Sequence, residues 1–244
     1  AGTQATGGSA GTGGSTSTTE PDSDSDAGLA LTDLLVDDFE DGDDQPLISG
    51  GWYSYDDASN GANSVLTFAG ATGSTIVMGG VGYESDKCLE ITYSFDQGTY
   101  TYAPYVGFGA SIGSTATPYD LSKYAGIAYV YKGGAHRVRV DTTDVTDYDV
   151  YGSDVPAATD WTAVTLPYTS FSQQGWGQKV DLNLSHVMNI SFGLTGSTGQ
   201  TGTLNIDNLR VVGATNQGSP DMTINPVSPP TDEVIASTDI PNPL

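Results

Sequence analysis

The segment Ile127–Asp141 reads IAYVYKGGAHRVRVD and contains two alternating runs separated by Gly133 and Gly134. Alternation of apolar and polar residues, rich in Val, Ile and Tyr, predicts β-strands because successive side chains of a strand point to opposite faces. Two glycines between two such runs predict a two-residue turn, since both turn positions tolerate positive φ. We therefore expect IAYVYK and AHRVRVD to pair as an antiparallel hairpin.

Other short alternating runs repeat this pattern along the chain and are separated by Gly, Asn and Asp. They are CLEITY (Cys88–Tyr93), WTAVTL (Trp161–Leu166), Val187–Leu194 and Thr203–Val212. Turn signals recur at intervals of roughly 8–12 residues, and helical periodicity is almost absent. The pattern predicts an all-β fold, a two-sheet antiparallel β-sandwich of the jelly-roll type.

Composition divides the chain into one compact region and two tails. Residues 1–28 are mostly Gly, Ser, Thr and Asp and have little to bury, which predicts a flexible linker. Residues 214–244 are rich in proline, which predicts a stiffer, extended linker toward a possible further domain. The β-sandwich is expected at residues 29–213, the region that contains all seven Lys and Arg residues.

Charge and cysteine content exclude several classes of function. The 244 residues have a net charge of −23, so the chain lacks the clustered cations that a nucleic-acid backbone requires. No run of 18 apolar residues indicates a transmembrane segment. Cys88 is the only cysteine, which excludes a disulfide framework and leaves a buried apolar residue or a nucleophile beside His136 or His186. The sequence has no H-E-x-x-H motif and no serine nucleophile elbow at a strand-to-helix turn, and we expect no catalysis.

Aromatic residues with a polar edge are unusually frequent. The chain has fourteen Tyr and three Trp but only six Phe. A flat apolar ring with a polar rim suits stacking on sugar rings, although alternating tyrosines can also simply line a solvent-facing sheet. The candidates are Trp52, Tyr53, Tyr55, Tyr100, Tyr102, Tyr105, Tyr148, Tyr151 and Trp176. Trp176 lies in the polar stretch QQGWGQK, and an exposed aromatic of that kind indicates a binding surface.

The stretch VDDFEDGDDQ (Val36–Gln45) contains six acidic residues around one aromatic residue. Paired catalytic carboxylates, a solvated turn or a metal site are all compatible with it. Calcium is the best use of so many acids, because it takes 6–8 oxygen ligands in irregular geometry. We expect Asp38 and Glu40 to flank Phe39 on a strand, with Phe39 pointing into the core.

Three segments in this order, LLVDDFEDGD, WTAVTLPYTSFSQQGWG and GTLNIDNLRVVG, resemble family 11 carbohydrate-binding modules of the galactose-binding-like jelly-roll superfamily. The similarity spans residues 34–213 and is closest to modules attached to endoglucanases of fibre-degrading bacteria. It implies a concave aromatic cleft for β-glucan or cellulose chains, and structural Ca²⁺ where the first and last strands lie side by side. The implied metal ligands are Asp38, Glu40 and Asp207.

The resemblance also implies which residues bind carbohydrate. Tyr55, Tyr105 and Trp176 fall at the stacking positions, and Arg139, Asp141 and Tyr148 could hydrogen-bond sugar hydroxyls. Tyr151 and Gln174 complete the expected set. This sequence departs from the family at two points, with Leu194 at a fourth aromatic position and Gln173 or Gln174 where the family has an arginine.

These features together predict a secreted or cell-surface bacterial protein without enzymatic activity of its own. It would recognise β-glucan or cellulose and keep a covalently attached glycoside hydrolase, family 5-like, near plant polysaccharide. The alternative is a structural or adhesive protein of an extracellular surface assembly or filament, in which the jelly roll makes protein contacts.

Overall fold

The structure, a computed structural model, describes residues 31–48, 50–70 and 79–213. The two predicted linkers, 1–28 and 214–244, lie outside the described residues. Within the described part of the chain, no helix is long and apolar enough to cross a membrane.

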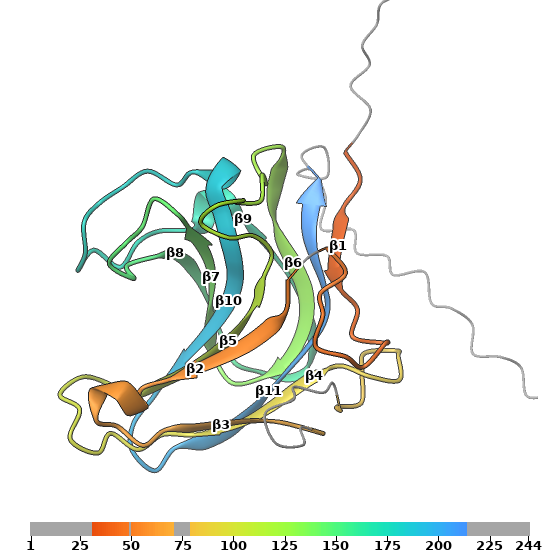
Figure 1. The fold of residues 1–244 in the computed structure, drawn as a ribbon. Coiled ribbons are helices and arrows are strands. Elements are labelled where there is room, and N and C mark those ends of the chain that lie inside the picture. The colour runs from red at the N-terminus through yellow and green to blue at the C-terminus, as the bar shows by residue number, and fades with distance from the viewer. Residues whose placement is uncertain (1–30, 49, 71–78, 214–244) are drawn as a thin grey trace, which may run out of the picture.

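The described residues form two antiparallel β-sheets packed face to face (Figure 1). The six-stranded sheet has the order β3-β4-β11-β6-β9, and β1 also pairs with β11. Its strands are β1 (Leu34–Asp37), β3 (Val65–Phe68), β4 (Leu89–Ser94), β6 (Tyr124–Gly133), β9 (Ala158–Pro167) and β11 (Thr201–Gly213).

The five-stranded sheet has the order β2-β5-β10-β7-β8. Its strands are β2 (Trp52–Asp56), β5 (Tyr105–Ser111), β7 (His136–Thr142), β8 (Tyr151–Val155) and β10 (Val187–Thr195). Short 3₁₀ turns are η1 (Ala58–Asn60), η2 (Tyr168–Ser170) and η3 (Leu184–His186). The predicted β-sandwich is confirmed.

The predicted hairpin around Gly133 and Gly134 is wrong, because its two strands belong to different sheets. β6 lies between β11 and β9, whereas β7 lies between β10 and β8. Both strands thus have a hydrogen-bonded partner on each side, and neither has a free edge for the other. Gly133, with φ of 120°, makes the sharp reversal. A glycine pair therefore marked the turn correctly but did not determine which strands pair.

His136 lies where the chain passes from one sheet to the other. It is 5% exposed, and its Nδ1 lies 3.0 Å from the Gly134 carbonyl oxygen. A carbonyl can only accept, so Nδ1 carries the proton and Nε2 accepts from the Tyr129 hydroxyl at 2.7 Å. Burial lowers the pKa of His136 to about 4, although its hydrogen bond to Gly134 opposes the shift. The neutral imidazole thus bonds β7 to β6 across the sandwich.

Aromatic packing fills the space between the sheets. The rings of Phe108 and Phe192 are stacked at 5.1 Å, and Tyr129 meets Phe192 edge-on at 5.4 Å. Trp52 also points inward, and its Nε1 donates to Asp37 Oδ2 at 2.7 Å. This bond ties β1 of one sheet to β2 of the other. Burial raises the pKa of Asp37 to about 6, although the hydrogen bond from Trp52 lowers it.

Strand β11 pairs with two strands along the same edge. β4 occupies the edge from Thr201 to Ile206, and β1 occupies it from Leu209 to Val211. Between them Asn208 has a positive φ of 53°. The first and last strands do lie side by side, as predicted, and the break leaves Asp207 at the junction.

We expect His136→Gln to lower the free energy of unfolding most at neutral pH. Because the folded pKa of His136 lies below the unfolded value of about 6.5, the unfolded chain binds the extra proton first as pH falls. The native protein therefore loses about 3 kcal/mol from this group between pH 7 and pH 4. Glutamine does not titrate, so the stability gap between the two proteins should narrow on acidification.

Denaturant unfolding at pH 7 and pH 4.5 measures this gap. The control is His186→Gln, which alters the other histidine, a half-exposed residue paired with Asp144 at 3.0 Å. A gap for His136→Gln that stays constant with pH would contradict the assignment of a neutral, buried imidazole.

Candidate functional site

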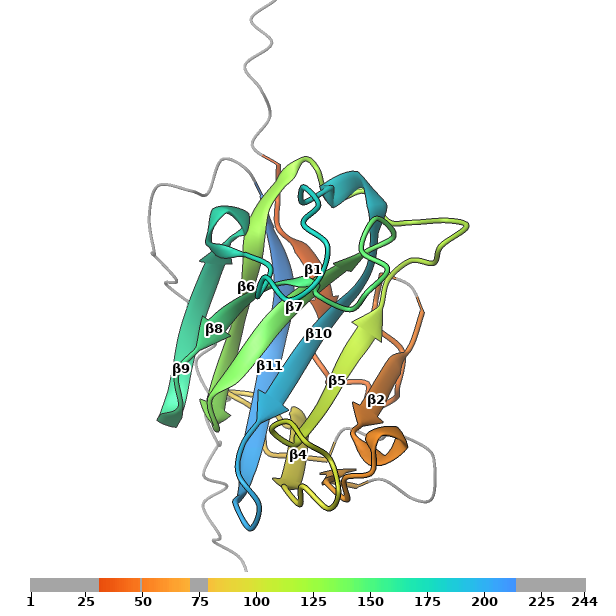
Figure 2. The ribbon, with the colours of Figure 1, turned by 90° about the vertical axis from the view of Figure 1, so that its left-hand side faces the viewer.

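The five-stranded sheet turns its outer face toward the viewer in Figure 2. On this face tyrosine rings lie on a floor of glycines. Across the strands, Tyr55 is opposite Gly107, which is opposite Gly193. In the next row Tyr53 is opposite Gly109. A Cβ atom built on Gly107 would lie 2.1 Å from Cζ of Tyr55. Only glycine at this position lets the Tyr55 ring lie down on the sheet.

Arg139 and Asp141 project from β7 onto the same face, because Val138 and Val140, which alternate with them, are buried inside the sandwich. Arg139 Nη1 donates to the Tyr55 hydroxyl at 3.2 Å. Asp141 Oδ2 accepts from Asn189 Nδ2 at 3.3 Å. The face thus combines a flat ring with a cation and a carboxylate.

Among the described residues, none forms a hydrogen bond with the second oxygen of Asp141, although this oxygen is buried. Desolvation raises the pKa of this carboxyl, while the hydrogen bond from Asn189 and the charge of Arg139 oppose the shift. A buried acceptor without a donor costs free energy, and a ligand hydroxyl could satisfy it.

A chain of tyrosines extends the face at one end. Ring centroids are 6.3 Å apart for Tyr55 and Tyr105, 6.2 Å for Tyr105 and Tyr100, and 5.6 Å for Tyr100 and Tyr102. Asn60 Nδ2 donates to the Tyr105 hydroxyl at 2.9 Å, and Tyr102 is 71% exposed. We call Tyr100, Tyr102 and Tyr105 the tyrosine rim.

The buried carboxylate of Asp57 organises the loop behind this rim. Asp57 Oδ2 accepts from the backbone N–H of Tyr105 at 2.8 Å and from Ser64 Oγ at 2.7 Å. Asp57 Oδ1 accepts from the backbone N–H of Ser64 at 3.1 Å. These bonds join the η1 loop to the start of β5.

The loop between β7 and β8 and the loop before η3 lie at the other end of the sheet (Figure 1). Each of them contains an exposed aromatic residue. Tyr148 is 85% exposed and Trp176 is 62% exposed. Between them the carboxylate of Asp149, which is 2% exposed, accepts three backbone N–H bonds. The donors are Gln174 at 2.8 Å, Gly175 at 2.9 Å and Gly177 at 3.0 Å. Desolvation raises the pKa of Asp149, but these backbone donors together hold it below its ordinary value.

Most of the predicted carbohydrate-binding residues are therefore placed around one sheet face. Tyr55, Arg139 and Asp141 lie on the face itself, and Tyr105 lies at one end. The residues at the other end are Tyr148, Gln174 and Trp176.

Three of the aromatic or family-derived expectations are corrected by the structure. Tyr151 is opposite the buried Val140, packs against the core and donates its hydroxyl to the Val180 carbonyl at 2.7 Å, so it does not lie on the face. Trp52 and Leu194 are core residues, 6% and 1% exposed.

Sequence reasoning missed the glycine floor and the two loop-organising aspartates, Asp57 and Asp149. The alternation in YVGFGAS (Tyr105–Ser111) was an available signal for the floor, because it places both glycines on one side of β5. Neither aspartate had a comparable signal, since each bonds to backbone groups distant in the sequence.

Asp207 marks a second, acidic region at the junction of β4, β1 and β11. Its Oδ2 accepts from the Tyr83 N–H at 2.7 Å and from Ser85 Oγ at 3.0 Å, and its Oδ1 accepts from the Asn208 N–H at 2.7 Å. Desolvation raises the pKa of Asp207, and the negative charge of Glu40 nearby adds to the shift. Two of the three predicted metal ligands are thus neighbours.

The predicted strand through Asp38 and Glu40 is wrong. β1 ends at Asp37, and Phe39 has a left-handed φ of 64°. Phe39 is nevertheless buried in the core, as expected. Asp38 Oδ1 accepts from the Glu40 N–H at 3.3 Å, a local turn contact. A side-chain carboxylate that accepts a hydrogen bond from a backbone N–H two residues later favours a local turn over an extended strand.

The oxygen atoms near Asp207 fit calcium only as a mixed set. Glu40 Oε1 accepts from the Lys87 N–H at 3.1 Å, and the Lys87 carbonyl is 3.2 Å from Ser85 Oγ. The described residues include no group of three or more His, Cys, Asp or Glu side chains that could hold a metal ion. The oxygen groups near Asp207 are the carboxylate of Glu40, the Lys87 carbonyl and the Ser85 hydroxyl, which are of the ligand type that Ca²⁺ takes, and the calcium site stays a prediction.

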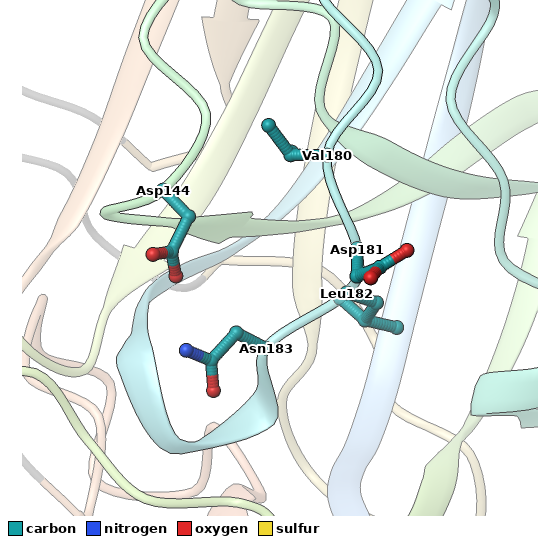
Figure 3. A pocket seen from close by; sticks show the side chains of 5 residues that line it. All are labelled: Asp144, Val180, Asp181, Leu182 and Asn183. Carbon is teal, nitrogen blue, oxygen red and sulfur yellow. The ribbon is translucent and has the colours of Figure 1, made fainter.

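A shallow hollow lies beside the Trp176 loop, lined by Asp144 and residues 180–183 (Figure 3). Asp144 and Asn183 point into the same side of it, whereas Asp181 and Leu182 point the other way. Asp144 Oδ2 and Asn183 Nδ2 each lie 3.0 Å from His186 Nδ1, which donates to the carboxylate when it carries a proton and accepts from the amide when it does not. Both side chains are thus in contact with His186, and the hollow lacks the aromatic residues of the sheet face.

Comparison with known proteins gives two sequence matches. The family described as complex I intermediate-associated protein 30 (CIA30) matches residues 39–207. Endoglucanase 3 of Fibrobacter succinogenes (strain ATCC 19169 / S85) is 37% identical over 215 residues, which is 86% of this chain and 32% of that protein. The chain therefore spans about a third of the length of this curated relative.

Solved structures with a similar fold include a family 11 carbohydrate-binding module from Clostridium thermocellum, in complex with a β-1,3-1,4-mixed-linked tetrasaccharide. The match has a TM-score of 0.51 and 20% identity and covers 76% of this chain and 98% of that chain. The family 11 module of the cellulosomal cellulase Lic26A-Cel5E of the same organism matches with a TM-score of 0.50 and 19% identity, over 76% of this chain and 97% of that chain. At this level of identity the similarity establishes the fold.

Proposed function

The chain belongs to the CIA30 family, and on that premise we propose that it is a non-catalytic carbohydrate-binding module for β-glucan or cellulose chains. The observation that carries this proposal is the glycine-floored face, where Tyr55, Arg139 and Asp141 lie side by side between two aromatic ends. A sugar ring has apolar C–H faces that pack on tyrosine and tryptophan rings, and its hydroxyl rim needs donors and acceptors. Arg139 supplies donors and Asp141 supplies acceptors.

The relatives support this assignment without determining the ligand. The F. succinogenes relative is named an endoglucanase, and this chain matches about a third of its length. A family 11 module with the same fold is described with a mixed-linked β-glucan tetrasaccharide. We propose that this chain is an extracellular accessory region that keeps a linked glycoside hydrolase near its polysaccharide.

The carboxylates of the face support a role without catalysis. Glycoside hydrolysis generally requires two carboxyl groups that flank the scissile bond, one of them as acid. Asp154 Oδ1 is paired with Arg137 Nη1 at 2.9 Å on β8 and β7, and Asp141 is held by Asn189. Neither arrangement presents two free carboxyls to one sugar linkage.

Replacing the stacking residues should weaken glucan binding. We expect Tyr55→Ala, Tyr105→Ala and Trp176→Ala each to lower the affinity for mixed-linkage β-glucan about 2- to 10-fold, because one aromatic contact contributes about 0.5–1.5 kcal/mol. Affinity electrophoresis in β-glucan and xyloglucan gels and calorimetry with cellohexaose measure the effect. Trp161→Ala is the matched control, since Trp161 lies on β9 of the other sheet.

Unretarded migration of the native protein in every glucan gel would refute the proposal. An oligomer in size-exclusion chromatography with light scattering that also binds no glucan would favour the structural or adhesive alternative. Release of reducing ends by the purified chain would contradict the absence of catalysis.

We also propose a structural Ca²⁺ at the acidic junction, held by Glu40, Asp207 and the Lys87 carbonyl. A cation would offset the repulsion between two neighbouring carboxylates and would bind only the folded chain, so it should add to stability. We expect calcium to raise the Tm, and Asp207→Asn to reduce this rise. Asp160→Asn, an exposed acid on β9, is the control. An identical Tm in saturating EDTA and in calcium would exclude the site.

A further inference from the structure

The position of Trp176 depends on the backbone of its loop. The ring is 62% exposed, so packing against the core does not fix its orientation. Its indole Nε1 lies 3.5 Å from Gln174 Oε1, at the limit of a hydrogen bond. Gly175, immediately before it, has φ of 89°, a conformation that a glycine adopts without strain. An exposed ring on such a segment stays in one place only if the segment itself is held.

Asp149 is the group that holds it. Three backbone N–H groups on both sides of Trp176, from Gln174, Gly175 and Gly177, converge on the two oxygens of this one carboxylate. In the described chain no Lys or Arg forms a salt bridge with Asp149. Its charge is therefore balanced by amide dipoles, an arrangement that concentrates several charge-assisted bonds on one short segment.

Two further side chains complete the same network. Gln173 Nε2 donates to the Asp149 carbonyl at 2.8 Å and to the Gln178 carbonyl at 3.0 Å, and Gln173 Oε1 accepts from the Val180 N–H at 3.1 Å. Asp147 Oδ2 accepts from the Gln178 N–H at 2.5 Å. The Trp176 loop is thus bonded along its length to the loop that contains Asp149.

The residue before Asp149 is also specially placed. Tyr148 has a left-handed φ of 66° and is 85% exposed. A bulky residue in this region of φ is strained, and the surrounding structure must hold it there. Asp149, the next residue, is anchored by its bonds to the Trp176 loop, so this carboxylate lies between the exposed aromatic residues of both loops.

We infer that Asp149 is a positioning residue, which holds Trp176 in its binding orientation before a glycan chain arrives. The inference deepens the proposed function and rests on the role given there to Trp176. A loop already ordered in the free protein loses little conformational entropy on binding, so its affinity is higher than that of a mobile loop. Asp149 itself is buried beneath the loop and acts on the ligand only through Trp176.

The test compares Asp149→Ala and Asp149→Asn in a Trp161→Phe background. The two tryptophans that remain there are the exposed Trp176 and the buried Trp52. Time-resolved anisotropy and acrylamide quenching of Trp176 report how freely its ring moves. We expect faster local motion in Asp149→Ala, with β-glucan affinity about 3- to 10-fold weaker because the loop must then be ordered on binding. Asn retains one acceptor oxygen, so Asp149→Asn should fall between Ala and the native residue.

Asp144→Asn is the matched control, because Asp144 lies on the same loop but bonds to His186. If circular dichroism shows that Asp149→Ala does not fold, Gln173→Leu takes its place as the test variant, because it removes other hydrogen bonds that hold the same loop. Unchanged anisotropy and unchanged affinity in the folded variants would overturn the inference. Faster Trp176 motion with native affinity would confirm that Asp149 positions the ring but would refute a role of Trp176 in binding. The proposed function is tested separately, by whether the native protein binds glucan.

Discussion

The hydrogen bond between Tyr129 and His136 is the constraint on which the arrangement of the face depends. It joins the two sheets just where the chain passes from one to the other, and burial keeps the imidazole neutral. With His136 turned inward, the alternation of β7 turns Arg139 and Asp141 outward. A hairpin at Gly133 would have kept β6 and β7 in one sheet and separated these residues from Tyr55. The turn at Gly133 and Gly134 therefore helps determine which residues share the outer face with Tyr55.

The face itself combines a rigid floor with two ends that are organised in the same way. Missing side chains at Gly107 and Gly193 let neighbouring side chains lie flat on the strands, where pleated geometry alone would make them stand upright. At each end one buried aspartate accepts bonds from backbone N–H groups, Asp57 beside Tyr105 and Asp149 beside Trp176. Backbone amides replace cations as partners, which suits a chain with only seven Lys and Arg residues.

Much of this fold could be predicted from residue patterns, and the failures have physical reasons. β4, β10 and β11 were expected within one or two residues and β9 within three, because alternation and turn residues are local signals. The placement of β6 and β7 in different sheets was not predictable from the two glycines between them, since strand partners depend on burial over the whole sandwich. Tyr151 was misplaced because its side of β8 depends on register, which a single residue does not reveal. Asp149 was overlooked because its bonds reach across at least 25 residues.

The two aspartate-centred ends also bear on how such a surface could change over time. Each end is built from short loops with a bonding centre of its own, and the strands between them form a separate framework. A new loop that brings its own buried acceptor could be grafted at one end while the opposite end and the floor are left as they are. Diversification of this protein would then proceed by exchanging loops together with their anchors, whereas an aromatic residue transferred alone would arrive without the carboxylate that orients it.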